Sequence, residues 1–278
     1  MQYDNTPLPS PLETRQVRRS PGGLVHTDTL ATEVPVALVF NGVSHAVMMA
    51  TPQDLEAFAL GFALSEGILD RANQCFSIEV QPVKLACNAA VEVQLEIASP
   101  CFARLKQRRR SMLGNTGCGV CGLDSLQALD WTAPRIPFQS WAHTLQPTTV
   151  LRAMKAMEAL QVLNAACGSL HAAAWATPDG DVALVTEDVG RHNALDKLLG
   201  TLALTGRLAE QGWVLMSSRA SHELVRKCVR LQVPVLATIS APTDLAVAMA
   251  QHAGMQLWGL CRAPRAVCYT PVNSTSHA

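Results

Sequence analysis

Apolar and polar residues in the first third of the chain follow patterns that predict β-strands. Two apolar runs, residues 34–40 and 43–49, flank Asn41-Gly42. An Asn-Gly pair between apolar runs is the strongest short-range signal of a β-hairpin. Residues 76–85 and 91–97 alternate apolar with polar positions, which indicates strands with one face in solvent.

One helix is expected between these two pairs of strands. Thr51 is a capping residue, and Pro52 after it suits the first position of a helix. Gly67 is expected to end this helix. An apolar stripe of helical spacing gives it one buried face, formed by Leu55, Phe58, Ala59 and Phe62. The first lobe is therefore predicted to be α+β.

From residue 148 onward, strand-like and helical segments alternate. The strands are short and nearly continuous in apolar residues, which is typical of a parallel or mixed sheet covered on both faces. The second lobe is therefore predicted to be an α/β layer structure. The expected strands are residues 182–185, 213–216, 233–239 and 255–260, and the run 170–175 fits a strand or a helix. The expected helices are residues 150–163, a segment through Leu195, Leu198, Leu199 and Leu202, residues 221–231 and residues 244–252.

The length of 278 residues allows two lobes, since domains commonly have about 100–200 residues. Residues 1–26 are polar and rich in proline, which suggests a loose N-terminal arm. The smaller lobe is expected over residues 27–110. Residues 111–147 read as a cysteine-containing loop and a connector, and residues 148–278 as the larger lobe.

Charge and cysteine content narrow the classes of function. The 22 basic residues balance the 22 acidic residues, so no overall field attracts nucleic acid or an anionic membrane. No apolar run reaches the length of a membrane helix, and the N-terminus lacks the apolar segment of an export signal. We therefore expect a cytoplasmic protein. Its nine scattered cysteines fit reduced thiols better than a disulfide framework.

The most distinctive stretch is the glycine-rich segment 114–122, which contains Cys118 and Cys121. A thiolate is the reactive form of cysteine, and nearby guanidinium charge or a helix N-terminus lowers the pKa of a thiol. Arg108, Arg109 and Arg110 lie just upstream, and leucines at helical spacing follow. A buried, inert pair is the alternative, but a packed position rarely needs glycine on either side. Cys118 and Cys121 are therefore the candidate nucleophiles.

Polar loops follow the strands of the second lobe, where ligands of α/β sheets bind. The first, residues 187–193, contains Arg191 and His192, and the second, 217–221, contains Ser218 and Arg219. The third is residues 240–244. Capping of the following helices accounts for Ser221 and Asp244, but it does not account for His192 or the arginines. We expect phosphate groups to bind here. A further cluster after the last strand adds Leu260, Cys261, Arg262, Ala263, Pro264 and Arg265.

The roles of several residues at these loops stay open from the sequence. Glu187 and Asp188 could accept from a guanine or ribose group, but pairing with Arg191 is the safer expectation. His192 could act as a general acid or base, or be an ordinary hydrogen-bonded residue. Zinc deaminase chemistry is improbable because Ala173 stands where the catalytic glutamate would follow His171. A structural zinc site is also improbable, because four-ligand sites normally have a second close pair of ligands and the sequence has none.

Four blocks together resemble the formate dehydrogenase accessory sulfurtransferase family. They are residues 115–122, 168–175, 187–200, and 217–221 with 240–243. The resemblance implies a homodimer and a cytidine-deaminase-like three-layer C-terminal domain. It also implies that Cys118 is the persulfide cysteine, that Cys121 is its companion, and that residues 260–265 bind cofactor.

The same resemblance implies a function. Sulfur would pass from a cysteine desulfurase to the molybdenum bis(molybdopterin guanine dinucleotide) cofactor, which is the bound substrate, for the catalytic subunit of formate dehydrogenase. A GDP-like nucleotide would mimic part of that substrate. Two alternatives stay open, a non-enzymatic chaperone of the cofactor and a dithiol oxidoreductase of the thioredoxin kind.

Overall fold

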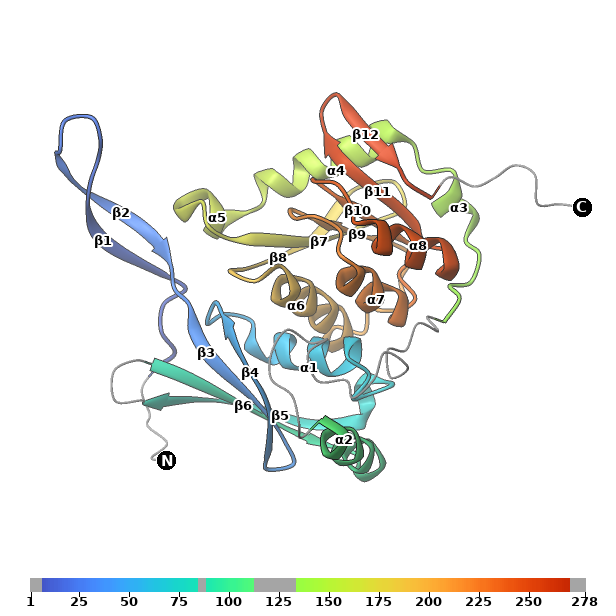
Figure 1. Ribbon diagram of the computed structural model, residues 1–278, viewed down its shortest axis with the longest axis horizontal. Helices are drawn as coiled ribbons and strands as arrows, with labels where there is room; N and C mark the ends of the chain where they lie inside the picture. Colours follow the sequence, from blue (N-terminus) through green and yellow to red (C-terminus); the bar gives the residue numbers. More distant parts are fainter. Residues whose placement is uncertain (1–6, 85–88, 113–133, 271–278) are drawn as a thin grey trace, which may run out of the picture.

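A computed structural model describes residues 7–84, 89–112 and 134–270, and its strands form three sheets (Figure 1). Two of them are the centres of the two expected lobes. The third is a two-stranded hairpin that projects from the side of the molecule. No helix among the described residues is long and apolar enough to cross a membrane. Cys118 and Cys121 lie outside the described residues.

The four-stranded sheet of the first lobe confirms the predicted strands. Its order is β4-β3-β6-β5. Strands β3 and β4 form the hairpin around Asn41-Gly42, and β6 runs parallel to β3 and antiparallel to β5. The inward side chains of β3, including Leu38 and Phe40, are fully buried in an apolar core. The bounds are β3 Val34–Phe40, β4 Val43–Ala50, β5 Cys75–Lys84 and β6 Ala89–Ile97.

Helix α1 (Leu55–Ser65) confirms the predicted helix but starts later than expected. Its N-cap is Asp54, whereas Thr51 contacts the second lobe. Gly67 follows the end of the helix with φ of +72°, a conformation that glycine adopts without steric cost. Residues on every side of α1 are buried, because one face packs on the small sheet and another on the second lobe.

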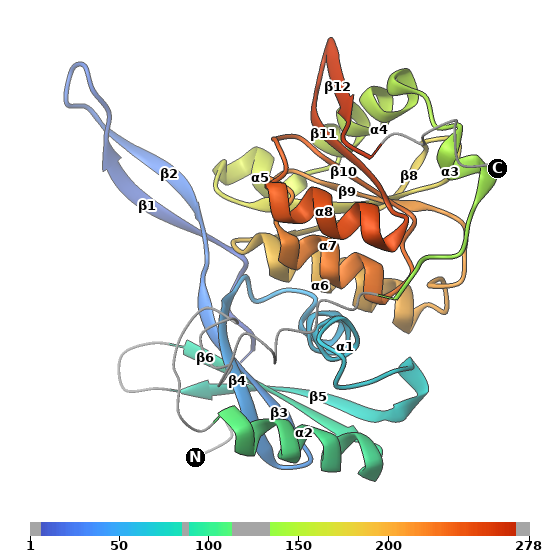
Figure 2. The same ribbon diagram turned by 45° about the vertical axis from the view of Figure 1, so that its right-hand side comes forward.

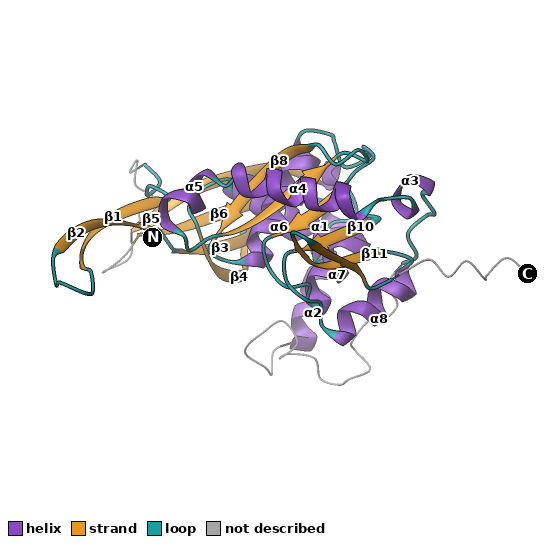
Figure 3. Ribbon diagram, turned by 90° about the horizontal axis from the view of Figure 1, so that it is seen from above, coloured by secondary structure: helices purple, strands orange, loops and turns teal. Residues whose placement is uncertain are grey.

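Several further elements were not expected from the sequence, among them the following. Residues 1–26 were predicted to be a loose arm, but β1 (Leu12–Arg18) pairs with β2 (Val25–Ala31) in a hairpin that projects from the molecule (Figure 3). Most residues of both strands are exposed. Helix α2 (Ser99–Met112) follows β6 and buries Cys101 and Leu105 against the first core. A short 3-10 helix, η1 (Ala72–Gln74), precedes β5.

The six-stranded sheet of the second lobe has the order β12-β11-β10-β9-β7-β8. Strands β9, β10 and β11 run parallel, whereas β7 is antiparallel to both β8 and β9, and β12 is antiparallel to β11. The sheet is therefore mixed, as expected. Its strands are β7 His171–Ala176, β8 Val182–Asp188, β9 Trp213–Met216, β10 Val235–Thr238, β11 Gln256–Arg262 and β12 Arg265–Cys268.

Helices cover both faces of this sheet, which confirms the prediction of a three-layer α/β lobe. Ala173 and Trp175 of β7 point into the core beneath α6, α7 and α8, whereas Ala172 and Ala174 point to the opposite core beneath α4. Figure 2 shows α6, α7 and α8 side by side above α1. The helices are α3 Ser140–His143, α4 Pro147–Ala159, α5 Val162–Cys167, α6 Arg191–Leu204, α7 His222–Arg230 and α8 Asp244–Ala253.

The two lobes meet where α1 crosses α6, and two glycines lie at the crossing point. A Cβ atom at Gly61 of α1 would lie 1.8 Å from the carbonyl oxygen of Asp196, and one at Gly200 of α6 would lie 1.8 Å from that of Ala57. Real side chains cannot approach backbone so closely. The backbones of the two helices are therefore in direct contact, and only glycine fits at either position.

Buried ion pairs surround this crossing. Lys227 of α7 is almost fully buried, and its ammonium group lies 2.8 Å from Asp196 of α6 and 2.9 Å from Glu66, at the end of α1. Ser65 also donates a hydrogen bond of 2.7 Å to Asp196. Burial acts to lower the pKa of Lys227, but the carboxylates of Asp196 and Glu66 outweigh it and raise the pKa. Lys227 therefore stays charged and joins the two lobes.

Replacing Gly200 with alanine should lower the free energy of unfolding by about 3 kcal/mol, since overpacking against rigid backbone costs this much. Gly206, just after α6, provides the matched control because it has open space and φ of +71°. Alanine there should cost only about 1–2 kcal/mol, for conformation alone. Urea unfolding of both variants measures the difference, and equal losses would show that the helices can separate freely.

Glu66 should make stability depend on pH. Burial acts to raise its pKa, but Lys227 and Arg226 outweigh it and lower the pKa from 4.5 to about 2. The stabilisation from a lowered carboxyl pKa is complete above the unfolded value and is lost as pH falls towards the folded one. Glu66→Gln should therefore remove about 2–3 kcal/mol at pH 7 and progressively less below about pH 4.5.

Urea unfolding between pH 7 and pH 3 tests the pH dependence of Glu66. Glu56→Gln is the control, because Glu56 is an exposed carboxylate on the same helix. A destabilisation by Glu66→Gln that is the same at every pH would contradict the prediction.

Candidate functional site

The polar loops predicted to bind phosphate lie at one edge of the six-stranded sheet. Strand β8 is antiparallel to β7, and β7 is antiparallel to β9, so β8 runs in the same direction as β9, β10 and β11. The carboxyl ends of these four strands therefore share an edge, as predicted. We call this end of the sheet the strand-end edge and define it by the segments that follow the four strands, residues 189–193, 217–221, 239–243 and 261–265.

The strand-end edge is wide. Four strand spacings separate β8 from β11, which corresponds to about 19 Å at about 4.8 Å for each spacing. Arg191 and His192 lie near the β8 end, and Arg262 and Arg265 near the other end. Ser218 and Arg219 follow β9, between the two. The structure thus brings the predicted residues to one edge but distributes them along its length.

Asp188, the last residue of β8, is fully buried and accepts hydrogen bonds from both lobes. Its carboxylate lies 2.7 Å from the ammonium group of Lys197. It also accepts from the backbone N–H of Thr51 in the first lobe, at 3.0 Å, and from that of Gly190, at 2.8 Å. The amide of Asn193 donates to Asp188 and to the carbonyl oxygen of Met49. These bonds fix the loop that leads to Arg191 and His192.

The expected pairing of Glu187 and Asp188 with Arg191 is wrong. Asp188 pairs with Lys197 instead, and Glu187 accepts from the backbone N–H groups of Leu163 and Asn164, at the start of α5. Lys197 is completely buried, and burial lowers its pKa while the Asp188 carboxylate opposes that shift. The sequence pattern did not single out Lys197 or Asn193 for these contacts. Both residues lie on the buried face of α6, just after a strand that ends in two acidic residues, and this placement could have predicted the contacts.

Arg191 and His192 instead meet Glu223, in the first turn of α7. The Nε2 atom of His192 lies 2.8 Å from a carboxylate oxygen of Glu223, and Nη2 of Arg191 lies 4.0 Å from the same oxygen. Burial lowers the pKa of His192, and Glu223 opposes this shift. His171, at the start of β7, also has a lowered pKa because of burial and the nearby Arg191. Glu223 was not predicted from the sequence. Its place two residues after Ser221, at the start of a helix that follows a strand, is the signal that could have identified it.

The second and third loops of the strand-end edge are held both by backbone hydrogen bonds, such as that from Ser240 N–H to the carbonyl oxygen of Ser218, and by serine hydroxyl groups. Ser217 accepts from the N–H of Ala172, and the buried Ser218 donates to the carbonyl oxygen of Arg219. The expected capping roles need correction. Thr243, rather than Asp244, caps α8 by accepting from Ala246, and Ser221 occupies the N-cap position of α7 without a capping bond from its side chain.

The turn between β11 and β12 carries the predicted residues 260–265. Leu260 has φ of +55°, and Cys261 is buried, which raises the pKa of its thiol to about 12. Burial therefore favours the neutral thiol of Cys261, which is the poorly nucleophilic form. The remaining residues of the turn are exposed, namely Arg262, Ala263, Pro264 and Arg265.

Other described cysteines are also poorly suited to nucleophilic chemistry. Burial raises the pKa of Cys75 to about 11 and also raises those of Cys228 and Cys268. Cys101 is completely buried. Within the described ranges no group of three or more His, Cys, Asp or Glu side chains could hold a metal ion.

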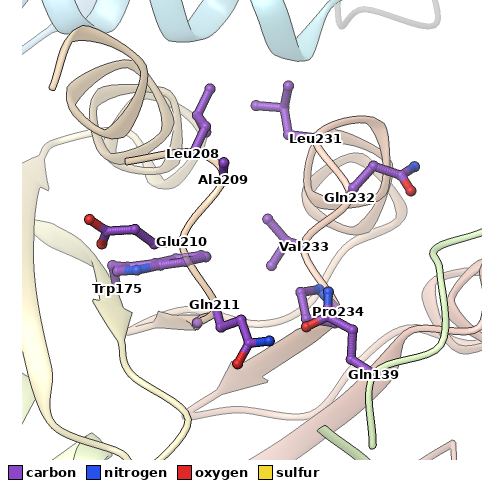
Figure 4. A pocket seen from close by; sticks show the side chains of 11 residues that line it. Gln139, Trp175, Leu208, Ala209, Glu210, Gln211, Leu231, Gln232, Val233 and Pro234 are labelled. Carbon is purple, nitrogen blue, oxygen red and sulfur yellow. The ribbon is translucent and has the colours of Figure 1, made fainter. Parts of the chain in front are cut away.

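Two cavities lie away from the strand-end edge. One, of about 200 Å³, lies at the other end of the strands, beside the amino-terminal ends of β9 and β10. The segments 208–212 and 231–234 form its facing walls, and Trp175 closes one side (Figure 4). The other, about 350 Å³, is an open hollow between the lobes lined by Leu60, Phe76 and Leu204, among others. Neither is lined by any residue predicted to be functional.

Comparison with known proteins decides the family. The family model described as FdhD/NarQ matches residues 31–275. The chain belongs to this family. Relatives named sulfur carrier protein FdhD include one from Chromobacterium violaceum, 55% identical over 243 residues that cover 87% of this chain and 88% of the relative. Another, from Burkholderia mallei, is 48% identical over 264 residues, or 94% of this chain and 96% of the relative.

A solved structure supports the fold of the whole chain. The crystal structure is described as that of a candidate formate dehydrogenase accessory protein from Desulfotalea psychrophila. It aligns with a TM-score of 0.67 and 22% identity, covering 94% of this chain and 96% of that one. The family match and the named relatives confirm the resemblance predicted from the four sequence blocks. The cytidine-deaminase-like character of the second lobe stays a prediction.

Replacing Lys197 with methionine should destabilise the chain by about 3–5 kcal/mol, because it leaves the buried Asp188 carboxylate without its partner. The double variant Asp188→Asn/Lys197→Met should recover part of the loss, since neither position then carries a charge. Lys155→Met removes an exposed lysine of α4 and is the control. Urea unfolding gives the three values, and a loss no larger than that of Lys155→Met would contradict the structural importance of the pair.

Proposed function

We propose that the chain is a sulfur carrier that takes sulfur from a cysteine desulfurase and delivers it to the molybdenum bis(molybdopterin guanine dinucleotide) cofactor of formate dehydrogenase. The observation that carries the proposal is the extended similarity to relatives named sulfur carrier protein FdhD, 55% and 48% identical over most of the chain. Formate dehydrogenase is proposed as the recipient because the structural relative is described as a formate dehydrogenase accessory protein. The cofactor is the substrate of the reaction, and the chain supplies a thiol and a binding surface.

The carrier atom is the sulfur of Cys118 or Cys121. In the proposed step, the thiolate attacks the outer sulfur of the donor persulfide and forms a new S–S bond, while the old S–S bond breaks and the desulfurase cysteine leaves as a thiolate. This acquisition step is redox-neutral, so it needs no external oxidant or reductant. The raised pKa values of Cys75, Cys228, Cys261 and Cys268 support this choice, because these residues are held as thiols.

Exposed arginines along the strand-end edge are the proposed contacts for the phosphates of the substrate. Arg219, Arg262 and Arg265 are exposed, and none forms an ion pair with another described residue. Guanidinium groups bind phosphate through pairs of parallel hydrogen bonds. Arg191, His192 and Ser218 extend the surface towards β8. A long substrate with several phosphates is the kind of ligand that suits a row of cations.

The proposal also includes partners and location. A cysteine desulfurase would be the donor, the catalytic subunit of formate dehydrogenase the receiver, and a homodimer the working form in the cytoplasm. The strand-end edge alone would also serve a chaperone that binds the cofactor without handling sulfur. The two cysteines separate these functions, since a chaperone would still activate its client without them.

Incubation with a cysteine desulfurase and cysteine should add about 32 Da to the chain, the mass of one sulfur atom on a thiol. Peptide mapping should place the addition on Cys118 or Cys121. The Cys118→Ala/Cys121→Ala variant should lose the adduct and the activation of formate dehydrogenase. Cys167→Ala is the matched control, because Cys167 is a partly exposed cysteine near the start of β7 and should leave both unchanged. An adduct that persists in the double variant would refute the assignment.

A further inference from the structure

One carboxylate at the strand-end edge occupies a position suited to a ligand anion. A single oxygen of Glu223 lies 2.8 Å from Nε2 of His192 and 4.0 Å from Nη2 of Arg191. The three side chains are about one-third exposed, at 27% for Glu223, 28% for His192 and 34% for Arg191. The side chains are therefore partly accessible from solvent, but Nε2 of His192 is itself buried while Glu223 lies beside it.

This contact reduces the positive charge that the β8 end of the strand-end edge presents to an anion. The formal charges of Arg191 and Glu223 cancel. Burial lowers the pKa of His192, so at neutral pH its imidazole adds a hydrogen-bond donor rather than a full charge. In contrast, Arg219, Arg262 and Arg265 face no carboxylate among the described residues. The edge thus has three exposed arginines and one that is already engaged.

We propose that Glu223 is a specificity-determining residue that competes internally with ligand phosphate for Arg191 and His192. A phosphate binds these two residues only when the Glu223 carboxylate turns away. The inference rests on the proposed function, because it assumes a phosphate-bearing substrate at this edge.

The position of Glu223 makes such a movement feasible. Glu223 lies in the first turn of α7, where a carboxylate is favourable beside the positive end of the helix dipole. Its carboxylate has no described hydrogen-bond or ion-pair partner other than these two residues. Turning away leaves the carboxylate in solvent and still near the helix start, so the displaced state loses little besides the two contacts.

Competition of this kind selects ligands by charge. A singly charged carboxylate or phosphate ester gains no more from Arg191 than Glu223 does, so it exchanges one anion for another. A diphosphate carries more negative charge and more acceptor oxygens, and can displace Glu223 while also reaching a neighbouring arginine such as Arg219. The cluster therefore favours diphosphate-containing ligands over smaller anions.

Calorimetric titration with inorganic pyrophosphate tests the inference on the full chain. Glu223→Gln keeps the length of the side chain and a polar group beside His192, but removes the negative charge. It should bind pyrophosphate about threefold to tenfold more tightly than the wild type, the effect of removing one nearby charge at a partly exposed site. Adding Arg191→Gln to this variant should abolish the gain. Glu210→Gln, which neutralises an exposed glutamate at the opposite edge of the sheet, should leave the affinity unchanged.

The outcomes separate this inference from the proposed function. Unchanged affinity in Glu223→Gln would overturn it, and weaker affinity would do so too, by making Glu223 a direct ligand. Absence of pyrophosphate binding in both proteins would overturn it as well. A protein that still acquires sulfur on Cys118 or Cys121 would then retain its function as a sulfur carrier. Thermal unfolding checks the folding of each variant, and Glu223→Ser provides a second neutral replacement.

Discussion

The contact between the backbones of α1 and α6 is the constraint on which the rest of the structure depends. Gly61 and Gly200 leave no side chain between the helices, so the first lobe lies close enough for Thr51, Ser65 and Glu66 to reach buried charges of the second. A longer separation would leave Asp188 and Asp196 without several of their partners. Hydrogen bonds and ion pairs from both lobes offset the desolvation cost of burying these carboxylates.

This arrangement also positions the candidate site. Asp188 ends β8, receives an N–H from Thr51 of the first lobe and binds Lys197 of α6, and three residues later the chain reaches Arg191. The loop at the β8 end of the strand-end edge is thus built jointly by both lobes. The turn at the other end, between β11 and β12, belongs to the second lobe alone. One end of the edge is therefore coupled to the lobe interface and the other is independent of it.

Much of the fold could be predicted because burial leaves a periodic pattern. The short apolar strands and the Asn41-Gly42 hairpin were recognised in this way, and the shared edge of the polar loops followed from the direction of the strands. The β1–β2 hairpin was missed because most of its residues are exposed, so no face is marked by apolar residues. Helix α2 was missed because few apolar positions, such as Cys101 and Leu105, face its core. Ion-pair partners such as Asp188 and Lys197 depend on tertiary geometry, which spacing along the chain does not encode.

The strand order sets a length scale for recognition. Arg191 belongs to the loop after β8, whereas Arg262 and Arg265 belong to the turn after β11, about four strand spacings away, or about 19 Å. A molecule with anionic groups at two separated points can bridge them, and each contact then raises the effective concentration for the other. On the proposed function, the spacing of the strands therefore favours the binding of extended molecules over that of their fragments.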